Sequence, residues 1–365
     1  MKIIRFIFIL ALVSVLFSAC ENEKEEGYGG YYYGVFILNE GTFMANNGSV
    51  SYFNPDSGAL VNNLFENING RPLGDVVQSM AIAGDKAYIV VNGSGKVEIV
   101  DLETFRTVAE PMIITYPRFF LPVDNEKGYI TSGSMQGYVY IADLTGNVVV
   151  DSIETGFGPE SMVRLGHFVY VANSGGWSVD STLTIIDTRN DNIRATLIVG
   201  DVPSDLALDG DDNLWVYCKG YATYSWDPPY DLISETEARL VKINTVTQAI
   251  DWTGVVGTAG QYTGTPPKLT VGADGETLYY LRPDGVYKLA VRNPSLAAEL
   301  ILAGAFYGLD VNPENGDLYL FQSSFTGNGS MVILDPVTLE TDTYTVGIGP
   351  SGAVFHLKQG QGTRK

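Results

Sequence analysis

The sequence predicts an all-β fold, a seven-bladed β-propeller with four antiparallel strands in each blade, over residues 34–358. Two observations predict it. Pairs of short strands joined by turns recur seven times, and each pair carries an aromatic residue near the start of its first strand. These residues are Phe36, Tyr88, Tyr129, Tyr170, Trp215, Tyr279 and Tyr319, at spacings of 52, 41, 41, 45, 64 and 40 residues. A period of about 40 to 45 residues with several strands per unit is typical of propellers.

Length and composition agree with this fold. The chain has 365 residues, about the length that seven blades need. Hydrophobic residues make up 45%, and 41 glycines with 22 tyrosines indicate turn-rich β structure rather than helices. With 42 acidic residues against 22 Lys and Arg, the net charge of −20 opposes binding to nucleic acid or anionic lipid through a general field. Solubility is the simplest role of this charge.

Residues 1–19 are predicted to be a signal peptide. Lys2 and Arg5 form its charged start, and the apolar run at 6–17 is too short to span a bilayer. Residues 17–20, Phe-Ser-Ala-Cys, resemble a bacterial lipobox, with Phe in place of the commoner Leu. The resemblance implies lipidation of Cys20 and durable anchoring if several acyl chains are attached.

Residues 20–33 are predicted to be a tether. Its acidic part, Glu-Asn-Glu-Lys-Glu-Glu at 21–26, resembles the signal with which Bacteroidetes send lipoproteins to the outer face of the outer membrane. An ordinary solvated linker is the alternative. Gly and Tyr residues up to position 34 complete a flexible spacer.

The first blade is expected to take its strands from both ends of the chain. Strands are predicted at 35–38 and 50–53, with an outer strand near 60–65, but no innermost strand precedes them. The apolar stretch at 349–357 supplies one. The C-terminal strand would thus complete blade one and close the ring, which removes the exposed sheet edges of an open array. Residues 359–365 are expected to be a disordered tail.

A proline precedes most of the innermost strands, where the first residue need not donate to the ladder. These prolines are Pro72, Pro117, Pro159, Pro203, Pro267 and Pro350, with Phe306-Tyr307 in the seventh blade. The inner strands are predicted at 76–82, 119–123, 161–165, 205–208, 269–271, 308–311 and 353–357. The residue after each proline should point to the mouth of the central channel: Leu73, Arg118, Glu160, Ser204, Lys268 and Ser351, with Tyr307 in the equivalent place.

Long loops are expected on one face of the ring. In a four-stranded antiparallel blade, the loop between the second and third strands opens on the same face as the start of the first strand. The loops of this class are long at 39–49, 173–182, 217–238 and 322–330, and each carries aromatic side chains. Extra residues on one face of a repeat array usually mark its binding face. Packing of the aromatics against the body of the protein is the alternative.

The candidate ligand-binding residues come from these loops and from the channel mouth. They are Phe43, Met44, Arg71, Asn92, Arg118, Glu160, Asn173, Trp177, Tyr221, Tyr224, Trp226, Tyr230, Lys268, Arg282, Tyr307 and Phe325. Aromatic walls with a few polar and cationic groups suit a large ligand that bears amides and a phosphate. A glycan or a protein loop would suit them too.

No catalytic or metal site is predicted, and we expect the chain not to be an enzyme. His167 and His356 are its two histidines, and neither has a metal-ligand neighbour at a useful spacing. Asp-Gly-Asp-Asp-Asn at 209–213 lacks the glutamate of a calcium loop, and a β-turn is the better interpretation. Cys218 has no disulfide partner in a lipidated chain and is expected to be buried and inert. A lyase or hydrolase with an acid–base pair from separate blades is the alternative from another class.

Two segments carry a family resemblance. Tyr-Val-Ala-Asn at 170–173 and Tyr-Ile-Val-Val-Asn at 88–92 are similar to the repeat of YVTN-type propellers, a resemblance that covers about residues 34–358. Together with the lipobox and the acidic tether, the chain resembles the surface propeller lipoproteins of Bacteroidetes that capture vitamin B12. The motifs that carry this resemblance lie at 38–41, 46–49, 70–75 and 158–160.

The resemblance implies a function in uptake. It implies that cobalamin or a related cobamide is a transported ligand rather than a catalytic cofactor, and that the partner is a TonB-dependent transporter of the outer membrane. The expected location is the outer membrane, with the domain facing the extracellular side and the lipid as its only membrane contact. A monomer apart from the transporter, without nucleic acid, is expected.

Overall fold

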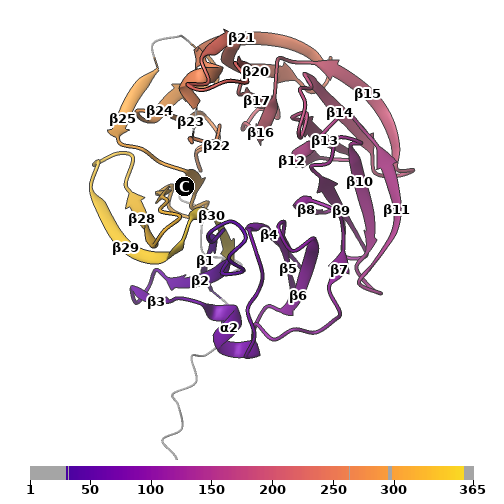
Figure 1. Ribbon diagram of the computed structural model, residues 1–365, viewed down its shortest axis with the longest axis vertical. Helices are drawn as coiled ribbons and strands as arrows, with labels where there is room; N and C mark the ends of the chain where they lie inside the picture. The colour runs from indigo at the N-terminus through magenta and orange to yellow at the C-terminus, as the bar shows by residue number, and fades with distance from the viewer. Residues whose placement is uncertain (1–29, 32, 263, 295–297, 357–365) are drawn as a thin grey trace, which may run out of the picture.

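The computed structural model describes residues 30–31, 33–262, 264–294 and 298–356. Within them, seven four-stranded antiparallel sheets stand side by side around a central channel, so the predicted seven-bladed propeller is confirmed (Figure 1). The predicted signal peptide, Cys20, most of the tether and the tail at 359–365 lie outside the described residues. No helix of the described part of the chain is long and apolar enough to cross a membrane.

Each blade runs from an innermost strand at the channel to an outermost strand at the rim. Blades one and two contain β30 (Pro350–His356), β1 (Gly34–Asn39), β2 (Ser49–Asn54) and β3 (Ala59–Val61), then β4 (Val77–Ala83), β5 (Lys86–Val91), β6 (Lys96–Asp101) and β7 (Met112–Ile113). Blades three and four contain β8 (Pro117–Pro122), β9 (Lys127–Ser132), β10 (Tyr138–Asp143) and β11 (Val148–Glu154), then β12 (Pro159–Leu165), β13 (Phe168–Asn173), β14 (Thr182–Asp187) and β15 (Asn192–Ile198).

The remaining three blades complete the ring. They contain β16 (Pro203–Leu208), β17 (Leu214–Cys218), β20 (Glu237–Asn244) and β21 (Ala249–Thr258), then β22 (Leu269–Val271), β23 (Thr277–Arg282), β24 (Gly285–Ala290) and β25 (Glu299–Ala303), and finally β26 (Gly308–Val311), β27 (Leu318–Gln322), β28 (Asn328–Leu334) and β29 (Thr341–Ile348). A two-stranded hairpin, β18 (Ala222–Tyr224) and β19 (Leu232–Glu235), is inserted into blade five.

The C-terminal strand closes the ring as the sequence predicts. β30 pairs with β1 in antiparallel register from Gly34 opposite His356 to Leu38 opposite Gly352. Blade one is therefore built from both ends of the chain, and β30 pairs the edge of β1 that would otherwise be exposed.

The repeated aromatic residues pack neighbouring blades together. All seven are buried. The Tyr88 ring of blade two stacks on the Phe120 ring of blade three, with their centroids 4.4 Å apart, and the Tyr319 ring of blade seven meets Phe355 of β30 edge-on at 5.0 Å. The sequence repeat thus reflects a packing contact that every blade must make with the next one.

The outer part of blade one differs from the prediction. The strand expected near 60–65 is β3, which ends at Val61, and the apolar pair Leu64 and Phe65 begins helix α2 (Leu64–Asn69) instead. Asn63, in the left-handed region with φ 55°, turns the chain out of the sheet. The helix lies between blades one and two, where it buries Leu64 and Phe65 in their shared core (Figure 1).

The predicted spacer is partly packed against the propeller. The Tyr31 ring meets the rings of Tyr52 and Phe105 edge-on, with centroids 5.0 and 6.3 Å away. The Tyr52 hydroxyl donates to the Tyr33 carbonyl over 2.5 Å. These contacts hold the end of the tether on blades one and two.

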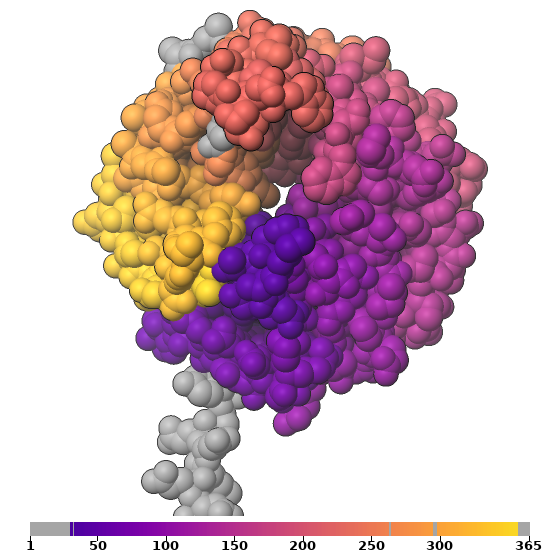
Figure 2. Space-filling view, viewed as in Figure 1, coloured from indigo at the N-terminus to yellow at the C-terminus, as the bar shows by residue number. Residues whose placement is uncertain are grey.

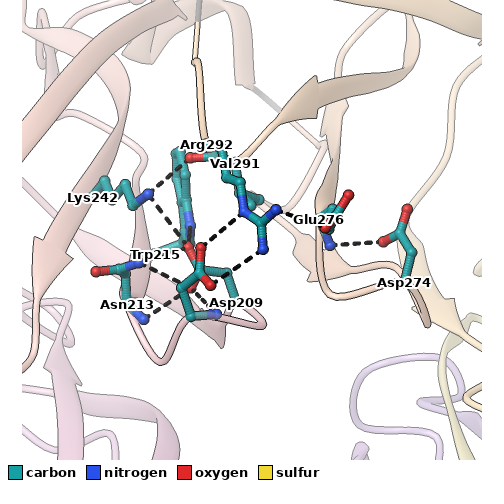
Figure 3. A network of polar contacts seen from close by, with 9 residues as sticks. Asp209, Asn213, Trp215, Lys242, Asp274, Glu276, Val291 and Arg292 are labelled. Atoms are coloured by element: carbon teal, nitrogen blue, oxygen red, sulfur yellow. Dashed lines mark hydrogen bonds and ion pairs between the residues drawn. The ribbon is translucent and has the colours of Figure 1, made fainter.

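A network of polar contacts joins blades five and six (Figure 3). The Asp212 amide donates to the Asp209 carbonyl over 3.0 Å, the pattern of a β-turn. The buried Asp209 carboxylate accepts from Trp215 Nε1 at 3.0 Å and lies 3.5 Å from Lys242 Nζ. Lys242 in turn donates to the Val291 carbonyl of blade six over 2.8 Å. The oxygens of Asp209 are therefore engaged by protein donors within the fold.

Cys218 is buried at the end of β17, and burial raises the pKa of its thiol to about 12. Because the thiolate is the reactive form, we expect Cys218 to resist iodoacetamide at pH 8 in the native chain and to react fully in denaturant. Mass spectrometry of the peptide that contains Cys218 measures this. Rapid native labelling would contradict the buried position.

Candidate functional site

A cavity of about 830 Å³ opens at the mouth of the central channel. Figure 2 shows it as a hollow near the centre of one face, below the blade-five hairpin (coral, at the top of the view). We call it the mouth cavity. Every blade contributes one side chain from the beginning of its innermost strand, and these form the mouth ring: Gln78, Arg118, Glu160, Ser204, Lys268, Tyr307 and Ser351.

β-bulges aim the mouth-ring side chains of blades two to five. The pairing of the first two strands shifts register between Val77 and Ser79, between Pro117 and Phe120, between Pro159 and Met162, and between Pro203 and Asp205. The extra residue of a bulge interrupts the ladder and redirects a side chain. In these blades that region holds the mouth-ring residue, which explains why the residue after each proline reaches the cavity.

Blade two corrects one prediction. Pro72 lies ahead of the first strand, which begins at Val77, and Leu73 is buried in the core rather than at the channel mouth. Val77 pairs with the last residue of β5, the register place that Pro117 takes in blade three, and Gln78 then joins the mouth ring. The proline pattern therefore gives a wrong prediction in blade two, where Val77 takes the position that a proline has in blades three to five.

The floor of the mouth cavity is charged. Arg118 Nε donates to both carboxylate oxygens of Glu160, at 3.0 and 2.9 Å. The Tyr307 hydroxyl donates to Glu40 Oε2 over 3.2 Å. Burial raises the pKa of the Glu40 carboxyl, against the opposing effects of Arg118 and of the Tyr307 hydrogen bond. Arg118 and Lys268 of the mouth ring are the two cations of the lining that the sequence predicts for the site.

Two further carboxylates lie along the innermost strands. Asp205 Oδ2 accepts from the Leu269 amide at 3.1 Å, which joins blade five to blade six. Asp310 Oδ2 accepts from the Ala353 amide at 2.7 Å, which joins blade seven to blade one. Burial raises the pKa of both carboxyls, that of Asp310 to about 7.

One wall of the mouth cavity is aromatic and comes from the insertion in blade five. Tyr221 and Tyr224 on the β18–β19 hairpin line the cavity, as does Tyr262 of the short helix η1 (Ala259–Tyr262). The Gly260 amide donates to Glu235 Oε2 over 2.8 Å and attaches the hairpin to that helix. The Tyr262 hydroxyl accepts from that of Tyr217 over 2.7 Å beneath it. The 64-residue interval in the repeat thus builds a wall.

The structure brings more than half of the predicted ligand-binding residues into the mouth cavity. Those that line it are Phe43, Asn92, Arg118, Glu160, Tyr221, Tyr224, Lys268, Tyr307 and Phe325. Four others, Met44, Trp177, Trp226 and Tyr230, are exposed on the same loops outside the lining. Phe43 next to Met44, and Gly176 and Ser178 next to Trp177, do line the cavity, so these two loops border the same opening. In the loop of Trp226 and Tyr230 the nearest lining residue in sequence is Tyr224.

The other three predicted residues do not line the cavity, because their side chains bind partners within the propeller. Arg71 pairs with the buried Glu98 and lies over the Phe65 ring, with its Cζ 4.8 Å from the centroid. Asn173 is buried and donates to Thr182 and Thr184 at 3.0 and 2.9 Å. Arg282 lies 4.6 Å over the Tyr287 ring. Their positions in the sequence put them near the loop-rich face, but their side chains contact residues of the strands and connections around them instead of the cavity.

Several lining residues lie outside the predicted ligand-binding set: Glu40, Gln78, Ser174, Lys219, Tyr262 and Thr265. Ser204 and Ser351 also line the cavity, at the channel mouth where the proline pattern predicts them. Glu40, Ser174 and Lys219 each directly follow the second strand of a blade, as Asn92 does. That shared place is a signal available from the repeat alignment alone. Within the described residues, no three His, Cys, Asp or Glu side chains gather closely enough to hold a metal ion.

Comparisons with known proteins agree with the fold. A family model described as "Domain of unknown function (DUF5074)" matches residues 33–335. No curated protein is similar enough to count as a relative.

Solved propellers are similar at low sequence identity. A quinoprotein alcohol dehydrogenase-like protein of Bacteroides thetaiotaomicron is 14% identical with a TM-score of 0.65, over 90% of this chain and 79% of that one. The periplasmic gluconolactonase of Pseudomonas aeruginosa is 15% identical with a TM-score of 0.61, over 88% of this chain and 99% of that one. A putative 6-phosphogluconolactonase of Bacteroides fragilis is 15% identical with a TM-score of 0.61, over 88% of this chain and 98% of that one. At such identities the likeness concerns the fold alone.

Proposed function

We propose that this chain, which belongs to the DUF5074 family, captures a large amphipathic small molecule in the mouth cavity, with cobalamin or a related cobamide as the first candidate. One observation carries the proposal. A single cavity on the loop-rich face combines an aromatic wall from blade five with a ring of mostly polar side chains from all seven blades. Such a combination of apolar surface and a few convergent polar groups is typical of small-molecule sites.

The size and chemistry of the cavity support a corrinoid. Its volume of about 830 Å³ lies in the upper part of the range of about 300–1,000 Å³ for ligand pockets. Tyr221 and Tyr224 offer flat faces for an apolar ring system, while Gln78 and Asn92 offer hydrogen-bond groups for amides. A cobamide would fill the cavity and extend between the rim loops.

The proposed role is capture without chemical change. A lipid at Cys20 would hold the propeller at the outer face of the outer membrane, and the ligand would pass from the mouth cavity to a TonB-dependent transporter. This part of the proposal rests on the lipobox and the acidic tether of the sequence.

Spectroscopy tests the proposal. The full chain in detergent, incubated with cyanocobalamin and desalted, should retain the corrin absorbance bands. The double variant Tyr221→Ala/Tyr224→Ala should bind at least roughly tenfold more weakly, because both rings of the wall are lost. Val337→Ala, at an exposed position in the turn after β28, is the control and should bind like the parent chain. A colourless desalted protein would overturn the choice of ligand.

A second candidate function is hydrolysis or elimination on a small molecule. It is favoured by the contact between Glu40 and the Tyr307 hydroxyl, beside the Arg118–Glu160 pair, because a carboxyl with a raised pKa can act as a general acid or base. This candidate would be favoured over capture if the chain turned over lactones or acidic oligosaccharides, and if Glu40→Gln abolished the turnover but left binding intact.

A further inference from the structure

We propose that the blade-five side of the mouth cavity, at Lys219, is a subsite for an anionic group of the ligand, a phosphate or a carboxylate. The inference rests on the mouth cavity being a binding site, as proposed above, but not on the ligand being a corrinoid. Any ligand of this cavity should therefore carry a negative charge, located next to Lys219.

Lys219 is a cation without a matching acid. It directly follows β17 and lines the mouth cavity. Within the described part of the chain, its ammonium group makes no ion pair with a carboxylate. Burial is the one cause that lowers its pKa, with no acidic neighbour to oppose it. A partly buried ammonium group without a counter-ion is unfavourable in an apolar setting, and a bound anion would remove that penalty.

The other cations of the mouth cavity are already balanced. Arg118 pairs with Glu160 at 2.9 Å. Lys268 lies 5.7 Å over the Phe119 ring and attracts the carboxyls of Asp205, Asp310 and Glu40 at longer range. Lys219, the third cation of the lining, has no such carboxylate neighbour within the described residues, so the uncompensated positive charge of the lining lies there. This local excess stands out in a chain with a net charge of −20.

The backbone holds Lys219 in place. Its amide donates to the Val202 carbonyl and the next amide, of Gly220, donates to the Asp201 carbonyl, both over 2.9 Å. Gly220 has φ +77° and sits against the carbonyls of Thr236 and Glu237, so a side chain there would strain the turn. The strand end that carries Lys219 is thus fixed on two sides, which suits a preorganised binding group.

The Ser204 hydroxyl lies close to the backbone of Lys219 and would have to turn away from its own carbonyl partner to donate to an anion. The Ser204 hydroxyl donates to the Val202 carbonyl over 2.9 Å, the same carbonyl that accepts from the Lys219 amide. Tyr221, two residues after Lys219, begins the aromatic wall. A ligand with an apolar ring next to a phosphate or carboxylate matches this order of groups. Because an anion favours the charged ammonium, its binding should weaken as the pH rises through the pKa of Lys219.

Competitive acetylation tests the subsite directly. The full chain in detergent is treated with acetic anhydride at constant ionic strength in four conditions: inorganic phosphate, glucuronate, glucose, and chloride alone. The labelling of each lysine is read by mass spectrometry. Phosphate or glucuronate should slow the labelling of Lys219 severalfold, glucose should not, and the stronger of the two anions identifies the preferred group. Lys288, whose Nζ lies 3.1 Å from Glu299 on the surface, is the internal control and should be unaffected. Equal labelling of Lys219 in all four conditions, including chloride alone, would overturn the proposal.

Variants separate charge from structure. Thermal stabilisation of the chain by the protecting anion should persist in Lys219→Arg, disappear in Lys219→Met and remain unchanged in Lys288→Met. Stabilisation of Lys219→Met equal to that of the parent chain would overturn the subsite. The anion result is also independent of the corrinoid assay: protection of Lys219 together with a colourless protein would retain the subsite and reject cobalamin.

Discussion

Replacement of Asp209 by alanine is expected to lower the free energy of unfolding by about 3–5 kcal/mol. The carboxylate is fully buried, and each of its oxygens accepts from the fold. One oxygen takes the amides of Asp211 and Asn213 at 3.0 and 2.9 Å, and the other takes Trp215 Nε1 at 3.0 Å. Alanine would leave these donors and the Lys242 ammonium without their acceptor (Figure 3).

The effect should reach beyond one turn. Lys242 lies 5.6 Å over the Trp215 ring and binds the Val291 carbonyl, so it connects the core aromatic residue of blade five to blade six. Loss of its partner therefore weakens both the blade and the contact between blades. In a closed ring each blade supports its neighbours, and the deficit should lower the stability of the whole domain.

Urea denaturation followed by tryptophan fluorescence measures this change. Asp211→Ala is the matched control, because Asp211 is an exposed acid in the same turn, paired with the exposed Arg292 at 3.1 Å. A surface pair of this kind contributes about 0–1 kcal/mol. Similar losses for both variants would show that the turn, rather than the buried carboxylate, determines the stability.

The sequence is sufficient to predict the ring, its seven blades and its closure, and the reason is physical. Each blade must pack against the next, so the residue that makes this contact recurs with the blade: Tyr88 against Phe120, and Tyr319 against Phe355. Closure can also be predicted from the sequence. The first blade lacks its innermost strand, and the apolar stretch that forms β30 supplies it. Such features are repeated or local, and the sequence displays them directly.

The candidate site is only partly predictable, because it depends on side-chain partners from other strands and blades. Arg71 and Lys219 are both cations near the loop-rich face, yet Arg71 pairs with the buried Glu98, whereas Lys219 pairs with no acid among the described residues. Nothing in their sequence neighbourhoods separates them. The bulges that aim the mouth ring are also hidden, since a one-residue shift in pairing reverses the face to which side chains point. The wrong prediction of Leu73 in the place of Gln78 has another cause, because Val77 rather than a proline begins the first strand of blade two.

Replacement of Asp310 by asparagine is expected to stabilise the protein at pH 8, unlike most substitutions of a hydrogen-bonded acid. Burial raises the pKa of the Asp310 carboxyl from 3.8 to about 7, with the carboxylate of Asp205 adding to the increase. The Asp310 hydrogen bond to the Ala353 amide, and the attraction of Lys268, oppose it but do not cancel it. An asparagine oxygen can still accept from that amide, while no charge has to be buried.

The pH dependence follows from the direction of this shift. Between about pH 4 and 7 the unfolded chain has lost the Asp310 proton and the folded chain keeps it, so this carboxyl makes stability fall as the pH rises through that window. The full difference corresponds to about 4 kcal/mol, at about 1.4 kcal/mol for each pKa unit, and solvent in the channel should reduce it. The variant should lack this decline, so its advantage over the parent chain should be absent near pH 4 and largest above pH 7.

Urea denaturation of both chains from pH 4 to 8 measures the difference. Asp342→Asn, at an exposed position on β29, should follow the parent curve at every pH. Parallel curves for the parent and Asp310→Asn would mean that solvent in the channel keeps Asp310 ionised in the folded state. A growing advantage of Asp310→Asn would instead mean that the channel beneath the mouth ring disfavours negative charge, which agrees with the proposal that an anionic group of the ligand binds at Lys219 in the mouth cavity.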